Sequence, residues 1–176
     1  SFLLILQQKI LRAGYVSRSL LVSKLKSVSR KEIPLSMRKI NEIFYSLQGE
    51  GYHTGMPAVF VRFSGCNLKC SFCDTRHEEG TWMSDEDIVR EVIKYPARVV
   101  ILTGGEPGLW IDERLVDALH QEGKYVCIET NGTCLLPENI DWVTCSPKEG
   151  AELKLDRMDE VKVVYVGQDV SPYLDL

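Results

Sequence analysis

No long apolar stretch occurs in the 176 residues of this sequence. The aliphatic runs at 2–6 and 99–102 are far shorter than the roughly 18 to 20 residues that a membrane-spanning helix needs. Cysteine is also scarce, because six residues are too few for a disulfide-stabilised scaffold. With 44% apolar and 26% charged residues, the composition is typical of a soluble globular domain. It excludes the transmembrane, disulfide-rich and disordered classes.

Clustered positive charge is missing from most of the chain. Residues 1–36 carry seven Lys and Arg against one acidic residue, whereas residues 37–176 carry fourteen against twenty-four. Non-specific nucleic-acid binding needs clustered basic side chains, so the acidic part argues against a direct nucleic-acid partner and favours small molecules. The basic leader 1–36 could pass for an organelle presequence by composition. We favour the interpretation that it lies outside the fold, which leaves one domain over 37–176.

Five short segments rich in β-branched and aromatic residues predict strands, and two amphipathic segments predict helices. The first helix should begin at Ser84, which can cap it, and the second should cover 112–121, with Gly123 ending it. The order βαβαβ implies parallel strands with helical crossovers. Cys127 and Cys145 fall in strand segments, where cysteine is usually a small buried residue. The predicted strands are 58–63, 99–103, 124–129, 142–145 and 160–165.

Polar and glycine-rich loops follow four of these strands, beginning at Ser64, Gly104, Thr130 and Ser146. In parallel α/β folds the ligand site lies at the carboxyl ends of the strands. We therefore expect the four loops to meet at one site.

The first of these loops holds Cys66, Cys70 and Cys73. Three thiolates so close in sequence can serve one metal site, and soft sulfur ligands select zinc or an iron–sulfur cluster. On a 4Fe–4S cluster, three protein ligands would leave one iron open, which indicates a reactive site rather than a structural one. A structural zinc with His77 as a fourth ligand is the alternative interpretation.

At this point several motifs resemble a known family. The Cys-x3-Cys-x2-Cys spacing and the Gly-Gly-Glu-Pro turn at 104–107 resemble the radical S-adenosylmethionine (SAM) superfamily. The motifs together resemble, more narrowly, the 7-carboxy-7-deazaguanine synthases of the queuosine pathway. This resemblance spans 37–165 and implies a carbon–nitrogen lyase with an α/β fold, a partial, open parallel βα barrel of the radical SAM type. The segments that carry it are 45–51, 61–63, 65–75, 102–107, 129–132 and 145–148.

The resemblance also implies the cofactors and the residues that hold them. Cys66, Cys70 and Cys73 match the ligands of a 4Fe–4S cluster whose open iron binds SAM, which is cleaved to methionine and a 5′-deoxyadenosyl radical. A magnesium ion is implied as well, and Thr75 matches its ligand. The positions that match SAM-binding residues are Phe72, Asp74, Gly105, Ser146, Pro147 and Lys148.

The substrate implied by the resemblance is 6-carboxy-5,6,7,8-tetrahydropterin, which undergoes radical ring contraction and loses ammonia. Arg62 matches the residue that holds the substrate carboxylate, for which a guanidinium fork is suited. Leu47, Gln48, Gly49 and Thr103 match further substrate contacts. The implied partners are an electron donor such as flavodoxin or ferredoxin and a second copy in a homodimer. Thiols that must stay reduced favour a cytoplasmic location.

Two features depart from the family. Gly108 stands where a small polar residue is expected, and the chain stops at Leu176, whereas the family continues through a C-terminal segment that helps to close the substrate site. We therefore expect this chain to bind a cluster but to turn over slowly. Two other functions stay open: another small radical SAM enzyme such as a glycyl-radical activase, and a non-catalytic zinc-stabilised binding module.

Overall fold

The computed structural model describes residues 37–73, 78–165, 167–173 and 176. The leader 1–36 and the predicted positions Asp74, Thr75 and His77 lie outside this part of the chain. Among the described residues, no helix is both long enough and apolar enough to span a membrane.

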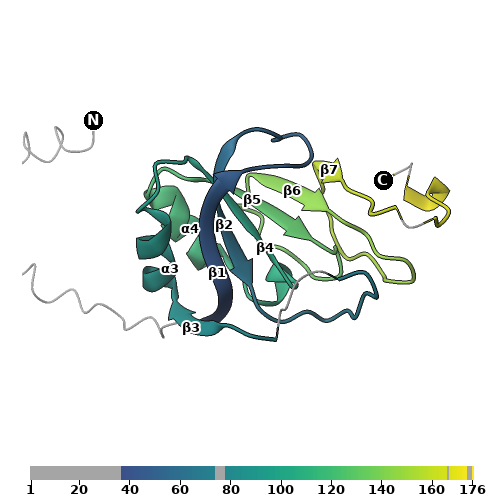
Figure 1. The fold of residues 1–176 in the computed structure, drawn as a ribbon, viewed down its shortest axis with the longest axis horizontal. Helices are drawn as coiled ribbons and strands as arrows, with labels where there is room; N and C mark the ends of the chain where they lie inside the picture. The colour runs from purple at the N-terminus through teal and green to yellow at the C-terminus, as the bar shows by residue number, and fades with distance from the viewer. Residues whose placement is uncertain (1–36, 74–77, 166, 174–175) are drawn as a thin grey trace, which may run out of the picture. The chain divides into compact units, whose positions relative to one another are not determined.

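A sheet with the strand order β3-β1-β2-β4-β5-β6-β7 forms the centre of the fold (Figure 1). Neighbouring strands from β2 to β7 pair in parallel, whereas β1 pairs antiparallel with both β2 and β3. The sheet is not closed into a full barrel, which confirms the predicted partial, open βα barrel. The parallel strands are β2 (Pro57–Phe63), β4 (Val99–Gly104), β5 (Tyr125–Thr130), β6 (Trp142–Cys145) and β7 (Glu160–Val161).

Two strands of the structure were not predicted from the sequence, and a third is shorter than predicted. β1 (Met37–Leu47) is exposed at its far end, so its apolar pattern is weak, and β3 (Thr81–Ser84) has only four residues. The predicted strand 160–165 is too long, because β7 pairs only with Thr144 and Cys145 at the end of the short strand β6.

Two helices pack on one face of the sheet (Figure 1). α3 (Asp85–Val92) begins where the Ser84 side chain accepts a hydrogen bond from the Asp87 amide, as the sequence predicts. α4 (Glu113–Gln121) begins at the Asp112 cap, and Gly123 follows it with a φ of 70°. Short 3-10 turns occur at η1 (Pro107–Leu109) and η2 (Ser171–Tyr173).

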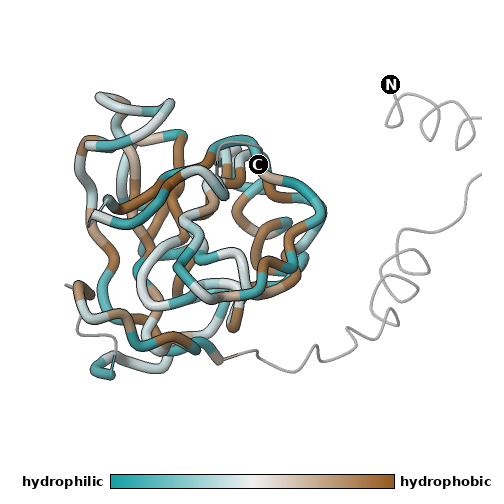
Figure 2. The backbone as a smooth tube through the Cα atoms, turned by 90° about the vertical axis from the view of Figure 1, so that its right-hand side faces the viewer, coloured by the Kyte–Doolittle hydropathy of each residue, from teal (hydrophilic) through white to brown (hydrophobic). Residues whose placement is uncertain are grey.

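Side-chain alternation along the strands gives the sheet two different faces. The face toward α3 and α4 forms the main core, which includes Val59, Val61, Val100 and Leu102. Hydrophobic and hydrophilic stretches alternate along the backbone (Figure 2). The opposite face, which we call the inner face, carries a smaller apolar cluster and, toward the carboxyl ends of the strands, polar side chains. Cys127 and Cys145 are buried, with 4% and 0% exposure, as predicted.

Candidate active site

A cavity of about 850 Å³ opens on the inner face, at the carboxyl ends of β2, β4 and β5. Most of the predicted site residues line it, although they come from five separate segments of the chain. Leu47, which is 61% exposed at the end of β1, and the buried Pro147 are not part of the lining. The predicted residues in the lining are Gln48, Gly49, Arg62, Cys66, Cys70, Phe72, Cys73, Thr103, Gly105, Ser146 and Lys148.

Gly105 lies where the loops after β2 and β4 meet backbone to backbone. Its amide donates to the Phe63 carbonyl at 3.0 Å, and the next amide, that of Glu106, donates to the Gly65 carbonyl at 2.8 Å. A Cβ at position 105 would overlap the Gly65 carbonyl oxygen and lie 2.6 Å from its carbon. The resemblance assigns this glycine to close approach of SAM, whereas the structure shows that the protein backbone already requires it.

The Glu106 side chain links the loop after β4 to the loop after β5. It is fully buried, and its Oε1 accepts hydrogen bonds from the Gly108 amide at 2.8 Å and the Thr130 hydroxyl at 2.7 Å. Its Oε2 accepts from the Asn131 amide at 2.7 Å. Burial raises the pKa of the Glu106 carboxyl, and the three hydrogen bonds oppose that shift. In the sequence, Glu106 stands out only as part of the Gly-Gly-Glu-Pro turn at 104–107.

The cysteine loop is held in place by two polar side chains from the loop after β5, the Asn131 amide and the Thr133 hydroxyl. Asn131 donates to the Asn67 side chain at 3.1 Å, and Asn67 donates to the Thr133 hydroxyl at 2.7 Å. The Cys66 sulfur accepts from the Leu68 amide at 3.4 Å and lies 4.0 Å from the Asn131 Nδ2. Burial raises the pKa of the Cys66 thiol, and the Leu68 amide opposes that shift.

The three thiols on this loop are better suited to bind a polynuclear metal cluster than a single metal ion. All three cysteine side chains line the cavity, and none of them is in a disulfide. Within the described ranges, no group of three or more His, Cys, Asp or Glu side chains is placed to hold one metal ion. A 4Fe–4S cluster binds its thiolates through separate iron atoms, so the sulfurs need not converge on a point. The zinc alternative relied on His77, which is outside the described part of the chain.

Basic side chains reach the cavity from two sides. Arg62 is partly buried, and its Nε donates to Glu42 on β1 at 2.8 Å, while its guanidinium lies 5.7 Å from the centre of the Phe44 ring. The Lys148 Nζ donates to the carbonyl and the hydroxyl of Ser146 at 2.7 and 2.6 Å. Burial lowers the pKa of the Lys148 ammonium. Both cations therefore already have partners at the cavity wall.

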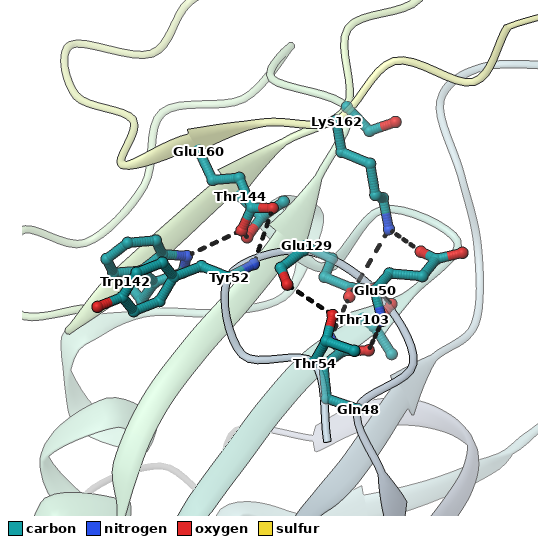
Figure 3. A network of polar contacts seen from close by, with 12 residues as sticks. Gln48, Glu50, Tyr52, Thr54, Thr103, Glu129, Trp142, Thr144, Glu160 and Lys162 are labelled. Carbon is teal, nitrogen blue, oxygen red and sulfur yellow. Dashed lines mark hydrogen bonds and ion pairs between the residues drawn. The ribbon is translucent and has the colours of Figure 1, made fainter. Parts of the chain in front are cut away.

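A carboxylate that the sequence analysis left without a role organises the other wall (Figure 3). Glu129 accepts from Gln48 Nε2 through one oxygen and from the Thr103 hydroxyl through the other, both at 2.9 Å. The Lys162 Nζ lies 3.7 Å from Glu129 and 2.8 Å from Glu50. Burial lowers the pKa of Lys162, but the neighbouring carboxylates outweigh this and raise it. Glu129 thus joins two of the predicted substrate residues.

The chain is similar to known proteins of one family. A family model described as the radical SAM superfamily matches residues 60–170. The 7-carboxy-7-deazaguanine synthase of Bacteroides thetaiotaomicron is 77% identical over 137 residues, which cover 78% of this chain and 75% of that protein. That of Bradyrhizobium diazoefficiens is 41% identical over 148 residues, 72% of this chain and 70% of that protein.

A solved structure gives the same result. The crystal structure of QueE from Escherichia coli superimposes with a TM-score of 0.66 at 31% identity, over 85% of this chain and 75% of that one. With identity this high to the Bacteroides relative over three quarters of that protein, the chain belongs to the 7-carboxy-7-deazaguanine synthase family of the radical SAM superfamily.

Proposed function

We propose that this chain converts 6-carboxy-5,6,7,8-tetrahydropterin to 7-carboxy-7-deazaguanine with loss of ammonia. The observation that carries the proposal is one cavity that combines a three-cysteine loop with a guanidinium and a hydrogen-bonded carboxylate. The first suits an iron–sulfur cofactor, and the other two suit a flat polar heterocycle that bears a carboxylate. The relatives named above carry the name of this activity.

Radical SAM enzymes contain a 4Fe–4S cluster and SAM, which together supply a carbon radical that can abstract a hydrogen atom from substrate. In this chain, Cys66, Cys70 and Cys73 would hold the cluster. The SAM-binding residues are proposed from the family pattern, and the cavity supports four of them because Phe72, Gly105, Ser146 and Lys148 line it near the cysteine loop. The assignments of Pro147, which is buried outside the lining, and of Asp74 rest on the family pattern alone.

Arg62 is the proposed partner of the substrate carboxylate. Its Nε is paired with Glu42, which restrains the guanidinium of a side chain that lines the cavity. Glu129 accepts hydrogen bonds only, so it suits the ring N–H groups of a pterin, with Gln48 and Thr103 beside it. Leu47 and Gly49 would contribute by backbone contacts, and Thr75 would supply a hydroxyl ligand to magnesium.

The test is turnover after anaerobic reconstitution. We expect 7-carboxy-7-deazaguanine to form only when pterin, SAM and a reductant are all present, and magnesium to raise the rate. R62A should raise the pterin KM at least tenfold, because a charge-assisted pair is lost, while R98A, at an exposed position before β4, should not. SAM cleavage that is independent of pterin, or stimulated by a protein substrate, would favour the activase alternative.

The remaining expectations are proposals with their own tests. We propose that the catalytic domain covers 37–176, which is supported by β1 beginning at Met37. A flavodoxin or ferredoxin would deliver the electron, and comparison of such a donor with dithionite tests this. A homodimer is supported by the family pattern and is tested by light scattering. A cytoplasmic location is supported by the need to keep the thiols reduced, and fractionation of cells tests it.

A further inference from the structure

The loop 48–56, between β1 and β2, delivers Gln48 and Glu50 to the cavity wall (Figure 3). Its two ends are tied to each other, because the Gln48 amide donates to the Met56 carbonyl at 2.9 Å and the Gly55 amide donates to the Gln48 carbonyl at 2.7 Å. These bonds continue the β1–β2 pairing beyond Leu47 and Pro57, so they hold the Gln48 backbone, whereas the tip of the loop, residues 49–54, depends on other contacts. The Gln48 side chain is linked to that tip, because its Oε1 accepts from the Glu50 amide at 3.2 Å while its Nε2 donates to Glu129.

Glu160 on β7 makes such a contact, and it lies 108 positions from its partner in the loop. Its Oε1 accepts from the Tyr52 amide at 3.2 Å. Its Oε2 accepts from the Trp142 indole and the Thr144 hydroxyl, both at 3.3 Å. All three partners are donors and both carboxylate oxygens only accept, so the ionised side chain satisfies both sides at once. Glu160 thus joins the loop to β6.

The fit between Glu160 and the loop is close. Gly51 has a φ of 70°, and a Cβ there would overlap the Glu160 carboxylate, with its Cδ only 2.8 Å away. The next residue, Tyr52, is 76% exposed, yet its ring stacks on Trp142 with centroids 4.8 Å apart and planes 20° apart. Gly51 leaves room for the Glu160 carboxylate, and the Tyr52 ring packs on Trp142 of β6. The two adjacent residues therefore hold the loop at the same point.

Lys162 gives the loop a second attachment to the same segment. Residues two apart in an extended chain share a face, and Glu160 and Lys162 both line a small pocket beside the loop, while Lys162 also lines the cavity. Its Nζ bonds Glu50 at 2.8 Å and reaches Glu129 at 3.7 Å. Glu160 and Lys162 thus hold positions 52 and 50, on either side of Gly51. The cysteine loop is held by other contacts, at Asn67 and Asn131.

We propose that Glu160 is a positioning residue for substrate binding: it holds the tip of loop 48–56 against β6, so that the Glu50 amide keeps the Gln48 side chain hydrogen-bonded to Glu129 in the cavity. The proposal rests on the proposed function for the identity of the substrate. Glu160 acts through the loop and not on the reacting atoms. Its loss should weaken binding of the pterin, while the cluster and the SAM-binding wall, which do not depend on the loop, keep their properties.

The test compares E160Q with D159N. Both variants replace one acid by its amide at adjacent positions, but the Asp159 side chain accepts from the Val143 amide and pairs with Arg157, and both of these partners lie outside the loop. A glutamine has a single acceptor oxygen, so it can satisfy the Tyr52 side or the β6 side but not both. Hydrogen exchange of the loop amides and steady-state kinetics with the pterin are measured on the anaerobically reconstituted protein.

We expect E160Q to raise both the exchange rate in the loop and the pterin KM about tenfold, with kcat and the SAM KM changed less than threefold. D159N should leave all four values within twofold of wild type. The proposal is overturned if the hydrogen-exchange rate of the loop amides is unchanged in E160Q, or if kcat falls while the pterin KM stays constant. A general structural defect would lower iron content and SAM binding as well, which contradicts the proposal equally.

A second variant covers the case in which E160Q does not fold. Y52A removes the stack on Trp142 from an exposed position, so it should fold, and it should raise the loop exchange rate and the pterin KM at least threefold. Unchanged values in Y52A would overturn the proposal. If the wild-type protein makes no product from the pterin, the proposed function is wrong, and the anchoring role is decided by loop exchange alone.

Discussion

The contact between Gly105 and Gly65 gives the most demanding prediction, because it holds the cysteine loop to the end of β4. The change is G105A. The added methyl group would overlap the Gly65 carbonyl oxygen, so the two backbones must separate. Separation strains or breaks the two backbone hydrogen bonds there, of 3.0 and 2.8 Å. Position 105 does not have a positive φ, so the cost is one of space and not of backbone conformation.

The magnitude follows from these contacts. Overpacking of a close contact costs about 1 to 3 kcal/mol, and each buried backbone group left without a partner costs about 1 to 3 kcal/mol more. We expect a loss of about 3 to 6 kcal/mol, which corresponds to a fall in melting temperature of roughly 6 to 24 °C for a chain of this size. The matched control is G123A, where a Cβ meets nothing within 4 Å and only the φ of 70° is strained, at about 1 kcal/mol.

The assay is thermal unfolding of both variants by circular dichroism under reducing, oxygen-free conditions. Because Gly65 directly precedes Cys66, G105A should also bind less iron on reconstitution than G123A does. A melting temperature for G105A as high as that of G123A would show that the loops tolerate a side chain there and would refute the steric argument.

Three further predictions test other parts of the fold. R38A should lower the free energy of unfolding in urea by about 3 kcal/mol, because the nearly buried Arg38 bridges Asp85 and Asp112, at the starts of α3 and α4. R90A removes a member of an exposed ion pair and should cost less than about 0.5 kcal/mol. Burial raises the pKa of the Glu106 carboxyl above its ordinary 4.5, so the folded protein binds that proton more tightly than the unfolded chain does, and stability is lost as pH rises through the raised pKa. The free energy of unfolding of wild type minus that of E106Q should therefore fall from pH 5 to pH 8. A difference that rises over this range would contradict the prediction. Burial raises the pKa of Cys127 to about 12 and of Cys145 to about 11, so mass spectrometry after iodoacetamide treatment at pH 8 should find both unlabelled in folded, cluster-free protein.

The sequence predicted those parts of the molecule whose determinants are local. The cap at Ser84 is set within a few residues and is confirmed, and the three closely spaced cysteines all line the cavity. The convergence of the loops could be predicted as well, because parallel strands put their carboxyl ends at one edge of a sheet. β1 escaped detection because half of it is exposed and its pairing with β2 is antiparallel.

The parts that could not be predicted depend on contacts between distant residues. Glu129 shares its oxygens with Gln48 and Thr103 only after β1, β4 and β5 are in register. In the same way, nothing near Glu160 in the sequence indicates that it would meet Tyr52. A glutamate in a short strand carries no local signal that separates such a role from a solvent-exposed position.

We propose above all that Cys66, Cys70 and Cys73, which line the cavity, together hold an iron–sulfur cluster. The most direct test is iron and sulfide analysis of the anaerobically reconstituted wild type beside C66A, C70A, C73A and the buried-cysteine control C127A. We expect about four irons per chain for wild type and C127A, with a broad absorbance that dithionite bleaches, and a loss of most iron in each of the other three variants. Colourless protein with a single zinc, or full iron in any of those three variants, would contradict it.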